Sequence, residues 1–459
     1  MRRWLGECKW AFVPRPEPKR GLGVIDASLI VVGSILGAGI FLVSGVVAAR
    51  TRSPAAFFGV WLIGGLVALS GALSNGELGA LFPRGGGEYV YLREAYGPPL
   101  GFLSGWTSFW IGFPGSIATL AWGFGHATAS LVGDRSGRSG VPIALTAIVV
   151  LTLVNALGLS PGKWTQNLLS GAKILAFAIL FGLAVFLPRT GPSHFIPFFG
   201  GAERPSNLAL ALVPVFFAYS GWNAATYVAG EIRNPSKNLG RALVVGTVAC
   251  VAIYLAVNVV YLRALSLSEM SSETDVAHAA ALRLSARAAT LVVTPLVAVA
   301  ILSSLQASVL TGPRIYQAMA EDGLFFTPLG RLDRRSRVPV VGLAVQGIIA
   351  CALLVSGTFE RLLTFTTFAI LMFSTLTVGA VLVLRVRWPG APRVFRTPLS
   401  PLVPLFFIVG NLWVMWNVIV SGAWEALAGV VIVAVGIPVY VWFRRGRQRL
   451  RFAGTRVAH

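Results

Sequence analysis

Long apolar stretches, repeated along almost the whole chain, constrain the fold of this protein more than any other feature of its sequence. Runs of about 20 mainly apolar residues cross a bilayer as helices, because lipid offers exposed backbone no hydrogen-bond partner. Only 12% of the 459 residues are charged, whereas a soluble domain carries about 25%. The pattern predicts an all-α integral membrane protein and excludes a soluble enzyme, a disordered regulator and a secreted disulfide scaffold.

Twelve runs are long and apolar enough to be transmembrane helices. They lie at 24–48, 55–80, 99–131, 141–160, 165–187, 207–229, 241–263, 289–311, 339–357, 362–384, 402–420 and 426–443. Most of the 38 Lys and Arg residues fall in the termini and in the even-numbered gaps between runs. Since basic residues are retained on the cytoplasmic side, we expect both termini to be cytoplasmic. The first 20 residues lack the apolar core of a cleavable signal, so no signal peptide is expected.

The net charge of +21 does not indicate a nucleic-acid partner. The basic residues sit in short gaps between apolar runs, whereas a nucleic-acid binder gathers them on one folded polar surface. The three cysteines and four histidines are scattered, and no cysteine pair has the spacing of metal ligands. We therefore expect neither a metal nor a cofactor.

The first run contains three glycines near its middle, Gly33, Gly37 and Gly39. Each glycine destabilises a helix by about 1 kcal/mol relative to alanine. One interpretation is close helix packing, because small residues let neighbouring helices approach each other. Alternatively the helix is broken here, and Gly37, Ala38 and Gly39 point free amides at an anionic ligand. The glycines alone leave both interpretations open.

The sixth run is interrupted at a similar depth, where Tyr219 to Asn223 bring small and polar residues into its middle. If runs 1–5 and 6–10 are inverted repeats, runs 1 and 6 are counterparts, and paired interruptions there indicate a transporter's binding site. The amino end of a half-helix is partly positive and the carboxyl end partly negative. A zwitterion therefore fits between two broken helices without any charged side chain.

Further motifs accompany these two segments. They are Pro83 to Tyr89, Lys163-Trp164 leading to Lys173, and Phe217 to Asn223 followed by Gly230 to Pro235. With the glycine segment, they resemble the amino acid–polyamine–organocation superfamily, most closely its L-type amino acid transporter branch and bacterial relatives. The resemblance extends over nearly the whole chain.

The resemblance implies a 5+5 inverted-repeat fold with broken helices 1 and 6. The expected organisation is a cytoplasmic tail at 1–23, a core at 24–384 with repeats at about 24–187 and 207–384, two added helices at 385–443, and a basic cytoplasmic tail at 444–459.

The resemblance also implies a small amino acid substrate between the broken runs, with its α-carboxylate on the glycine amides and its α-ammonium on nearby carbonyls. The expected substrate-binding residues are Ile35, Gly37, Ala38, Gly39, Phe217, Ser220, Trp222, Asn223, Ser304 and Ser308. Phe217 is the expected aromatic gate, although phenylalanine at this depth also serves for packing. Trp222, Asn223, Ser304 and Ser308 either touch substrate or join helices, and the sequence leaves that choice open.

Lys173 lies well inside the fifth run, where a cation is costly enough to indicate a function. A lysine at this family position takes the place of a sodium site in sodium-coupled relatives, which implies coupling without sodium. Three roles fit this position. The lysine either releases its proton, or stays charged during obligatory exchange, or is purely structural.

Three charged residues match family positions at the expected cytoplasmic ends of helices. We expect Glu77, and Glu231 with Arg233, to form charge pairs that hold the inward face closed or open. They are therefore expected to gate the protein without binding substrate.

The expected site segments contain no Asp or Glu, which favours a neutral substrate over a cationic amino acid or a polyamine. The loop at 132–140 has no cysteine, so no disulfide-linked partner subunit is expected, and we expect a monomer or homodimer. The compact loops between the apolar runs indicate a bacterial inner-membrane protein. A channel and an amino acid sensor without flux are the alternatives. A membrane enzyme needs a nucleophile with a base, or a metal cluster, which the scattered residues do not offer.

Overall fold

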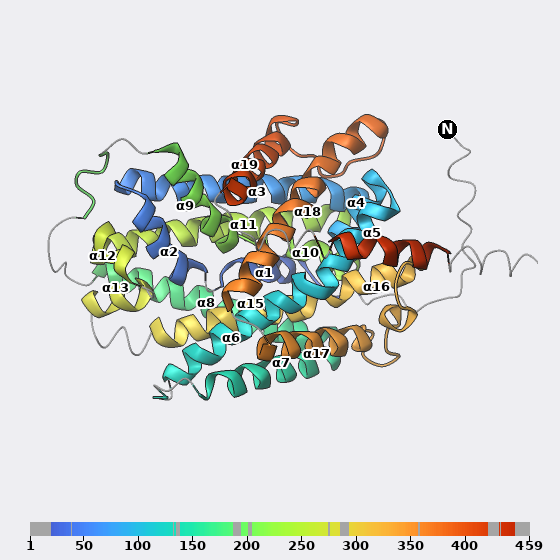
Figure 1. Cartoon of the computed structure of the whole chain (residues 1–459), viewed down its shortest axis with the longest axis horizontal. Coiled ribbons are helices and arrows are strands. Elements are labelled where there is room, and N and C mark those ends of the chain that lie inside the picture. The colour runs from blue at the N-terminus through green and yellow to red at the C-terminus, as the bar shows by residue number, and fades with distance from the viewer. Residues whose placement is uncertain are drawn as a thin grey trace, which may run out of the picture.

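The computed structural model describes residues 20–37, 39–131, 133–134, 138–186, 194–200, 204–273, 276–284, 293–356, 359–420, 431 and 433–445. Within these ranges the chain folds into helices without β-strands, apart from an isolated bridge between Leu22 and Ile232. Several of the longest helices run along the long axis of the molecule (Figure 1).

Most of the apolar runs correspond to one helix each. These helices are α3 (Pro54–Leu81), α7 (Gly140–Ala156), α8 (Leu159–Phe186), α11 (Pro235–Ala264), α15 (Thr294–Thr311), α17 (Val340–Ser356), α18 (Phe359–Arg387) and α19 (Leu402–Val420), with a further helical segment at 433–445. By length and composition, five of the described helical segments can cross a membrane, and five shorter ones are also apolar. The all-helical, apolar fold agrees with a membrane protein of the expected type.

The first run forms two helices, α1 (Val24–Ile35) and α2 (Gly39–Arg50). Leu36 and Gly37 between them are not helical, and Ala38 lies outside the described residues. The first run is therefore broken at this place, as one of the two interpretations expects, whereas the binding of an anionic ligand there stays a prediction. Gly37 and Gly39 favour the break, because each glycine destabilises a helix by about 1 kcal/mol relative to alanine.

The sixth run is also interrupted. Helix α9 (Pro205–Ala218) ends in a turn at 219–223, and the short helix α10 (Ala224–Tyr227) follows. Gly221 has a φ of 103°, a backbone conformation that residues other than glycine rarely adopt. The third run contains a π-helical stretch at Ser108–Gly112, between α5 (Pro98–Thr107) and α6 (Phe113–Leu131).

Four short helices lie in the predicted gaps. In Figure 1, α4 (Glu88–Tyr96) and α16 (Pro313–Glu321) lie near one end of the molecule, and α12 (Leu267–Ser272) and α13 (Val276–Leu284) lie near the other. By themselves α4, α12 and α13 are too short to cross a membrane, and α16 prolongs the apolar segment Pro295–Glu321 that contains most of α15. The two pairs show that the ends of the bundle carry structured connections.

Helix α1 occupies the centre of the bundle, where it packs against α8, α11 and α15. Its apolar side chains from Ile30 to Ile35 are almost completely buried, whereas Ile25 near its start is exposed. By contrast, α7, α8 and α17 present large apolar side chains outward, such as Leu153, Leu168 and Ile348. Outward apolar surface of this extent fits contact with lipid.

Candidate functional site

The carboxyl end of α1 exposes backbone carbonyls that the broken helix cannot pair, and Lys173 of α8 binds them. Its Nζ donates to Gly33 O at 3.1 Å, to Leu36 O, and to Ala300 O of α15 at 3.2 Å. The Lys173 side chain is completely buried. Because helix carboxyl ends carry partial negative charge, this ammonium stabilises the break.

Ser304 of α15 belongs to the same group. Its Oγ lies 2.6 Å from Gly33 O, and an added Cβ on Gly37 would lie 3.0 Å from that hydroxyl. Ser308 lies one turn further along and donates to Ser304 O at 3.0 Å. We call Lys173, Ser304 and the carbonyls of Gly33, Leu36 and Ala300 the α1-end cage.

Tyr254 of α11 joins the ends of the two broken helices. Its hydroxyl lies 2.7 Å from Ile35 O, the last residue of α1, and 2.9 Å from Ala218 O, the last residue of α9. The rings of Trp61 and Tyr219 pack around it. Sequence reasoning missed Tyr254, because one tyrosine in an apolar helix has no local signal.

Small residues bring the broken segments into close contact. An added Cβ on Gly39 would lie 2.7 Å from Ala218 Cα, and one on Gly221 would lie 2.7 Å from Ser34 Cβ. The Gly37 amide donates to Ile35 O at 2.7 Å. The first glycine segment and the 219–223 turn therefore face each other, as the inverted-repeat interpretation expects of counterparts.

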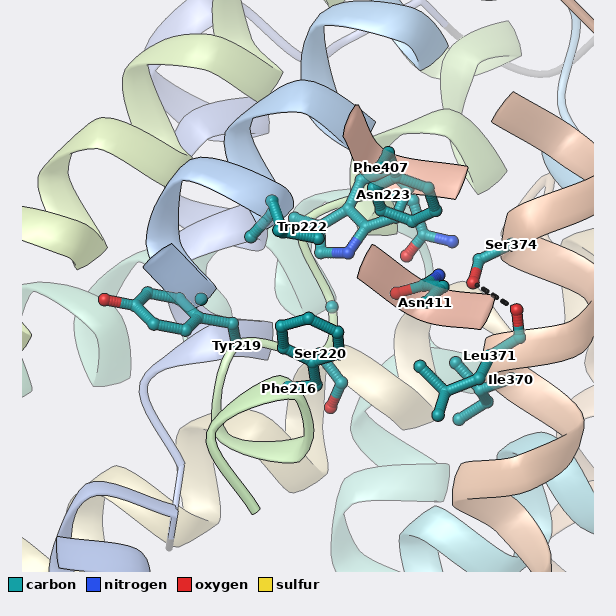
Figure 2. A pocket seen from close by; sticks show the side chains of 14 residues that line it. Phe216, Tyr219, Ser220, Trp222, Asn223, Ile370, Leu371, Ser374, Phe407 and Asn411 are labelled. Carbon is teal, nitrogen blue, oxygen red and sulfur yellow. Dashed lines mark hydrogen bonds between the residues drawn. The ribbon is translucent and has the colours of Figure 1, made fainter. Parts of the chain in front are cut away.

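A pocket opens beside the 219–223 turn (Figure 2). Residues of α3, α9, the turn, α18 and α19 line it, including the expected site residues Ser220, Trp222 and Asn223. Trp222 meets Phe407 edge to face at 5.3 Å between ring centroids. None of the lining residues is charged.

The expected site residues thus fall into two adjoining groups. Ile35, Gly37, Gly39 and Ser304 surround the end of α1, whereas Ser220, Trp222 and Asn223 line the pocket. Phe217 is half-buried on α9 and is not among the residues that line the pocket. Gly221, which touches Ser34 and also lines the pocket, connects the two groups.

Glu77 of α3 is almost completely buried and meets two arginines. Arg385 of α18 donates to both carboxylate oxygens at 2.9 and 2.7 Å, and Arg393 lies 3.0 Å away. The Thr397 amide adds a bond of 2.8 Å. This cluster ties α3 to the end of α18 and to the segment that follows it.

Glu231 is paired with Arg314 of α16 at 3.0 Å, and both side chains are buried. Arg233, which the sequence grouped with Glu231, is exposed and donates to Gly21 O at 3.3 Å. A buried carboxylate needs a buried cation, and Arg314 meets that need where Arg233 does not. Arg314 is distant in sequence, so its pairing was not predictable from spacing.

Asp322, directly after α16, binds side chains that lie in α4 and just before it. It accepts from Tyr89 Oη at 2.6 Å, lies 3.3 Å from Arg84 Nη2 and also pairs with Arg93. The Asp322 cluster therefore joins α4 to α16 at the end of the molecule where Figure 1 shows both. No motif in the sequence singles out Asp322.

Comparisons with known proteins identify the family of the chain. The amino acid permease family profile matches residues 22–443. The chain is 30% identical to the serine/threonine exchanger SteT of Bacillus subtilis (strain 168) over 433 residues, which cover 93% of this chain and 97% of the relative.

Two mammalian transporters are similar over most of their length. The b(0,+)-type amino acid transporter 1 of Mus musculus is 30% identical, with 93% of this chain and 88% of the relative covered. The large neutral amino acids transporter small subunit 2 of Homo sapiens is 28% identical, with 92% and 80% covered.

Proposed function

The chain belongs to the amino acid permease family of the amino acid–polyamine–organocation superfamily, and from this premise we propose that it carries small neutral L-amino acids across the cytoplasmic membrane by alternating access, without sodium. Like the relatives it resembles, it is a membrane-embedded amino acid transporter. It is not an enzyme. The pair of broken helices that meet at Tyr254 is the observation that carries the proposal.

The substrate's charged groups bind backbone dipoles at these breaks. Its α-carboxylate lies at the amino end of α2, near Gly37, Ala38 and Gly39, where partial positive charge favours an anion. Its α-ammonium lies at the carboxyl ends of α1 and α9, near Ile35 and Ser220, with Phe217 closing over it. The Gly37 amide donates to Ile35 O, so substrate binding exchanges this bond for contacts to the zwitterion.

The substrate side chain extends toward the uncharged pocket beside the 219–223 turn. Burying a cationic side chain without a counter-charge is costly, so this lining supports a neutral substrate.

Uptake of labelled L-serine into proteoliposomes tests the substrate class. Unlabelled serine, alanine and leucine are expected to compete at least about tenfold better than arginine, because a buried unpaired charge costs more than about 1.4 kcal/mol. Stronger competition by arginine or putrescine would establish the cationic alternative. Accelerated counterflow from amino-acid-loaded vesicles separates a carrier from a channel, and binding without flux would indicate a sensor.

Transport is expected to continue at the same rate, within about twofold, when potassium replaces sodium at constant ionic strength. The Lys173 ammonium already binds the carbonyls of Gly33, Leu36 and Ala300, and it repels another cation from the same place. Constant ionic strength matters because salt screens surface charges. Strict sodium dependence in this proteoliposome assay would contradict the sodium-independent mechanism.

The charge clusters around Glu77, Glu231 and Asp322 close the end that the basic residues assign to the cytoplasm. We place both termini on that side, in a bacterial inner membrane, and assign these clusters to the inward gate, with Arg233 at its rim. We further propose twelve spans arranged as two inverted repeats. The protein works as a monomer or homodimer without a disulfide-linked subunit, since the 132–140 loop has no cysteine.

A further inference from the structure

Glu88 is a buried carboxyl group that none of the roles above uses. It is the first residue of α4, directly after Gly87, and its exposure is 7%. A carboxylate rarely lies so deep without a cation beside it. Its surroundings therefore indicate how the group is held.

Asn223 supplies the contact to the Glu88 carboxyl group. The Asn223 Nδ2 atom lies 2.8 Å from Glu88 Oε1 and 3.0 Å from the hydroxyl oxygen of Tyr227. Asn223 also lines the uncharged pocket, as Figure 2 shows. The bond therefore links a helix near the end of the molecule directly to the proposed substrate site.

Two tyrosine hydroxyls, those of Tyr91 and Tyr227, interact with the Glu88 charge. The charged groups on the surrounding helices are paired with residues other than Glu88. On α4 itself, Arg93 pairs with Glu94 and Asp322. Helix α5 carries no charged residue. The remaining pairs are Arg314 with Glu231, Glu321 with Gln317, Arg385 with Glu77, and Arg387 with Ala95 O. In the described part of the chain, the carboxyl group of Glu88 thus faces an amide and two phenols.

This environment makes the charge of Glu88 sensitive to pH in the physiological range. Burial raises its pKa to about 7, and the Asn223 hydrogen bond opposes that rise. A carboxylate accepts a stronger hydrogen bond from an amide than a neutral carboxylic acid does. The Asn223 carboxamide is therefore held most firmly when Glu88 is ionised.

We propose that Glu88 is a proton-binding positioning residue for transport: its carboxylate fixes Asn223 against the pocket, and its protonation releases that carboxamide. The inference rests on the proposed function, since it assumes that Asn223 faces substrate. Through Glu88, helix α4 makes the position of Asn223 in the binding site depend on pH. Lys173 then serves the α1-end cage and need not release a proton.

The pH dependence of serine uptake tests this proposal, with the same pH on both sides of the proteoliposome membrane. Between pH 6 and 8 the ionised fraction of a group with a pKa of about 7 rises from about 10% to about 90%. Wild-type uptake at low substrate concentration is therefore expected to rise up to about tenfold. In Glu88→Gln it is expected to change by less than about twofold, because an amide does not titrate.

Glu94→Gln, on the same helix, is the matched control and is expected to keep the wild-type profile. Glu88→Asp retains a carboxyl group and is expected to keep a pH dependence. An unchanged profile in Glu88→Gln, or a flat one in Glu88→Asp, would overturn the assignment. If the wild type takes up no amino acid at all, the proposed function fails, and the melting experiment below still tests Glu88.

Thermal unfolding of the purified protein follows the same titration without transport. A carboxyl group with a raised pKa in the folded state keeps a proton that the unfolded state loses above its ordinary pKa of 4.5. Wild-type stability is therefore lost, relative to Glu88→Gln, as pH rises from about 4.5 to about 7, and the difference is constant above that. A melting-temperature difference that is the same at pH 5 and pH 8 would contradict the titration of Glu88.

Discussion

Replacing Lys173 by methionine is expected to reduce amino acid uptake at least about 100-fold. The substitution keeps a long apolar side chain but leaves the carbonyls of Gly33, Leu36 and Ala300 without their charged donor. Hydrogen bonds to a charged group contribute about 1.5–3 kcal/mol each, so losing even two of them reaches this magnitude. Serine uptake into proteoliposomes, normalised to the amount of inserted protein, measures the effect.

Lys237→Met is the matched control, because Lys237 is exposed near the start of α11. It is expected to transport like the wild type. Gel filtration in detergent shows whether Lys173→Met is folded. A folded Lys173→Met protein with near-normal uptake would show that the α1-end cage is not required for transport.

Replacing Gly39 by alanine is expected to lower uptake by about tenfold to 100-fold. The new Cβ would lie 2.7 Å from both Cα and Cβ of Ala218, so α2 and α9 must separate where the two broken helices meet. Overpacking of this kind costs about 1–3 kcal/mol, and here the cost falls on the geometry that binds the zwitterion. Initial uptake rates at several serine concentrations separate weaker binding from slower transport.

Gly59→Ala in α3 is the control for this second substitution, since an added Cβ there meets nothing within 4 Å. Equal uptake by both alanine variants would contradict a functional contact between the breaks.

The breaks themselves could be predicted from the sequence. Gly33, Gly37 and Gly39 weaken one helix, and Ser220 with Gly221 weaken another at a corresponding place, so two local signals supported each other. Lys173 was recognisable because a cation inside an apolar run needs compensating partners. These predictions depend only on what lipid and helix geometry require of a single segment.

The remaining parts of the site depend on tertiary structure. Tyr254, Asp322 and Arg314 are ordinary residues whose partners lie far away in the sequence, and no spacing brings them together. Arg233 was grouped with Glu231 because the two are close in sequence, but only Arg314 reaches the buried carboxylate. The short helices α4 and α16 escaped prediction because their amphipathic segments are too short to stand out from loops.

A density map of the protein in lipid nanodiscs with saturating L-serine tests the central claim most directly. We expect both α1–α2 and α9–α10 to remain separated, with the amino acid between residues 36–39 and the 219–223 turn. Two continuous helices, or serine bound away from these breaks, would contradict the proposed mechanism of recognition by backbone dipoles.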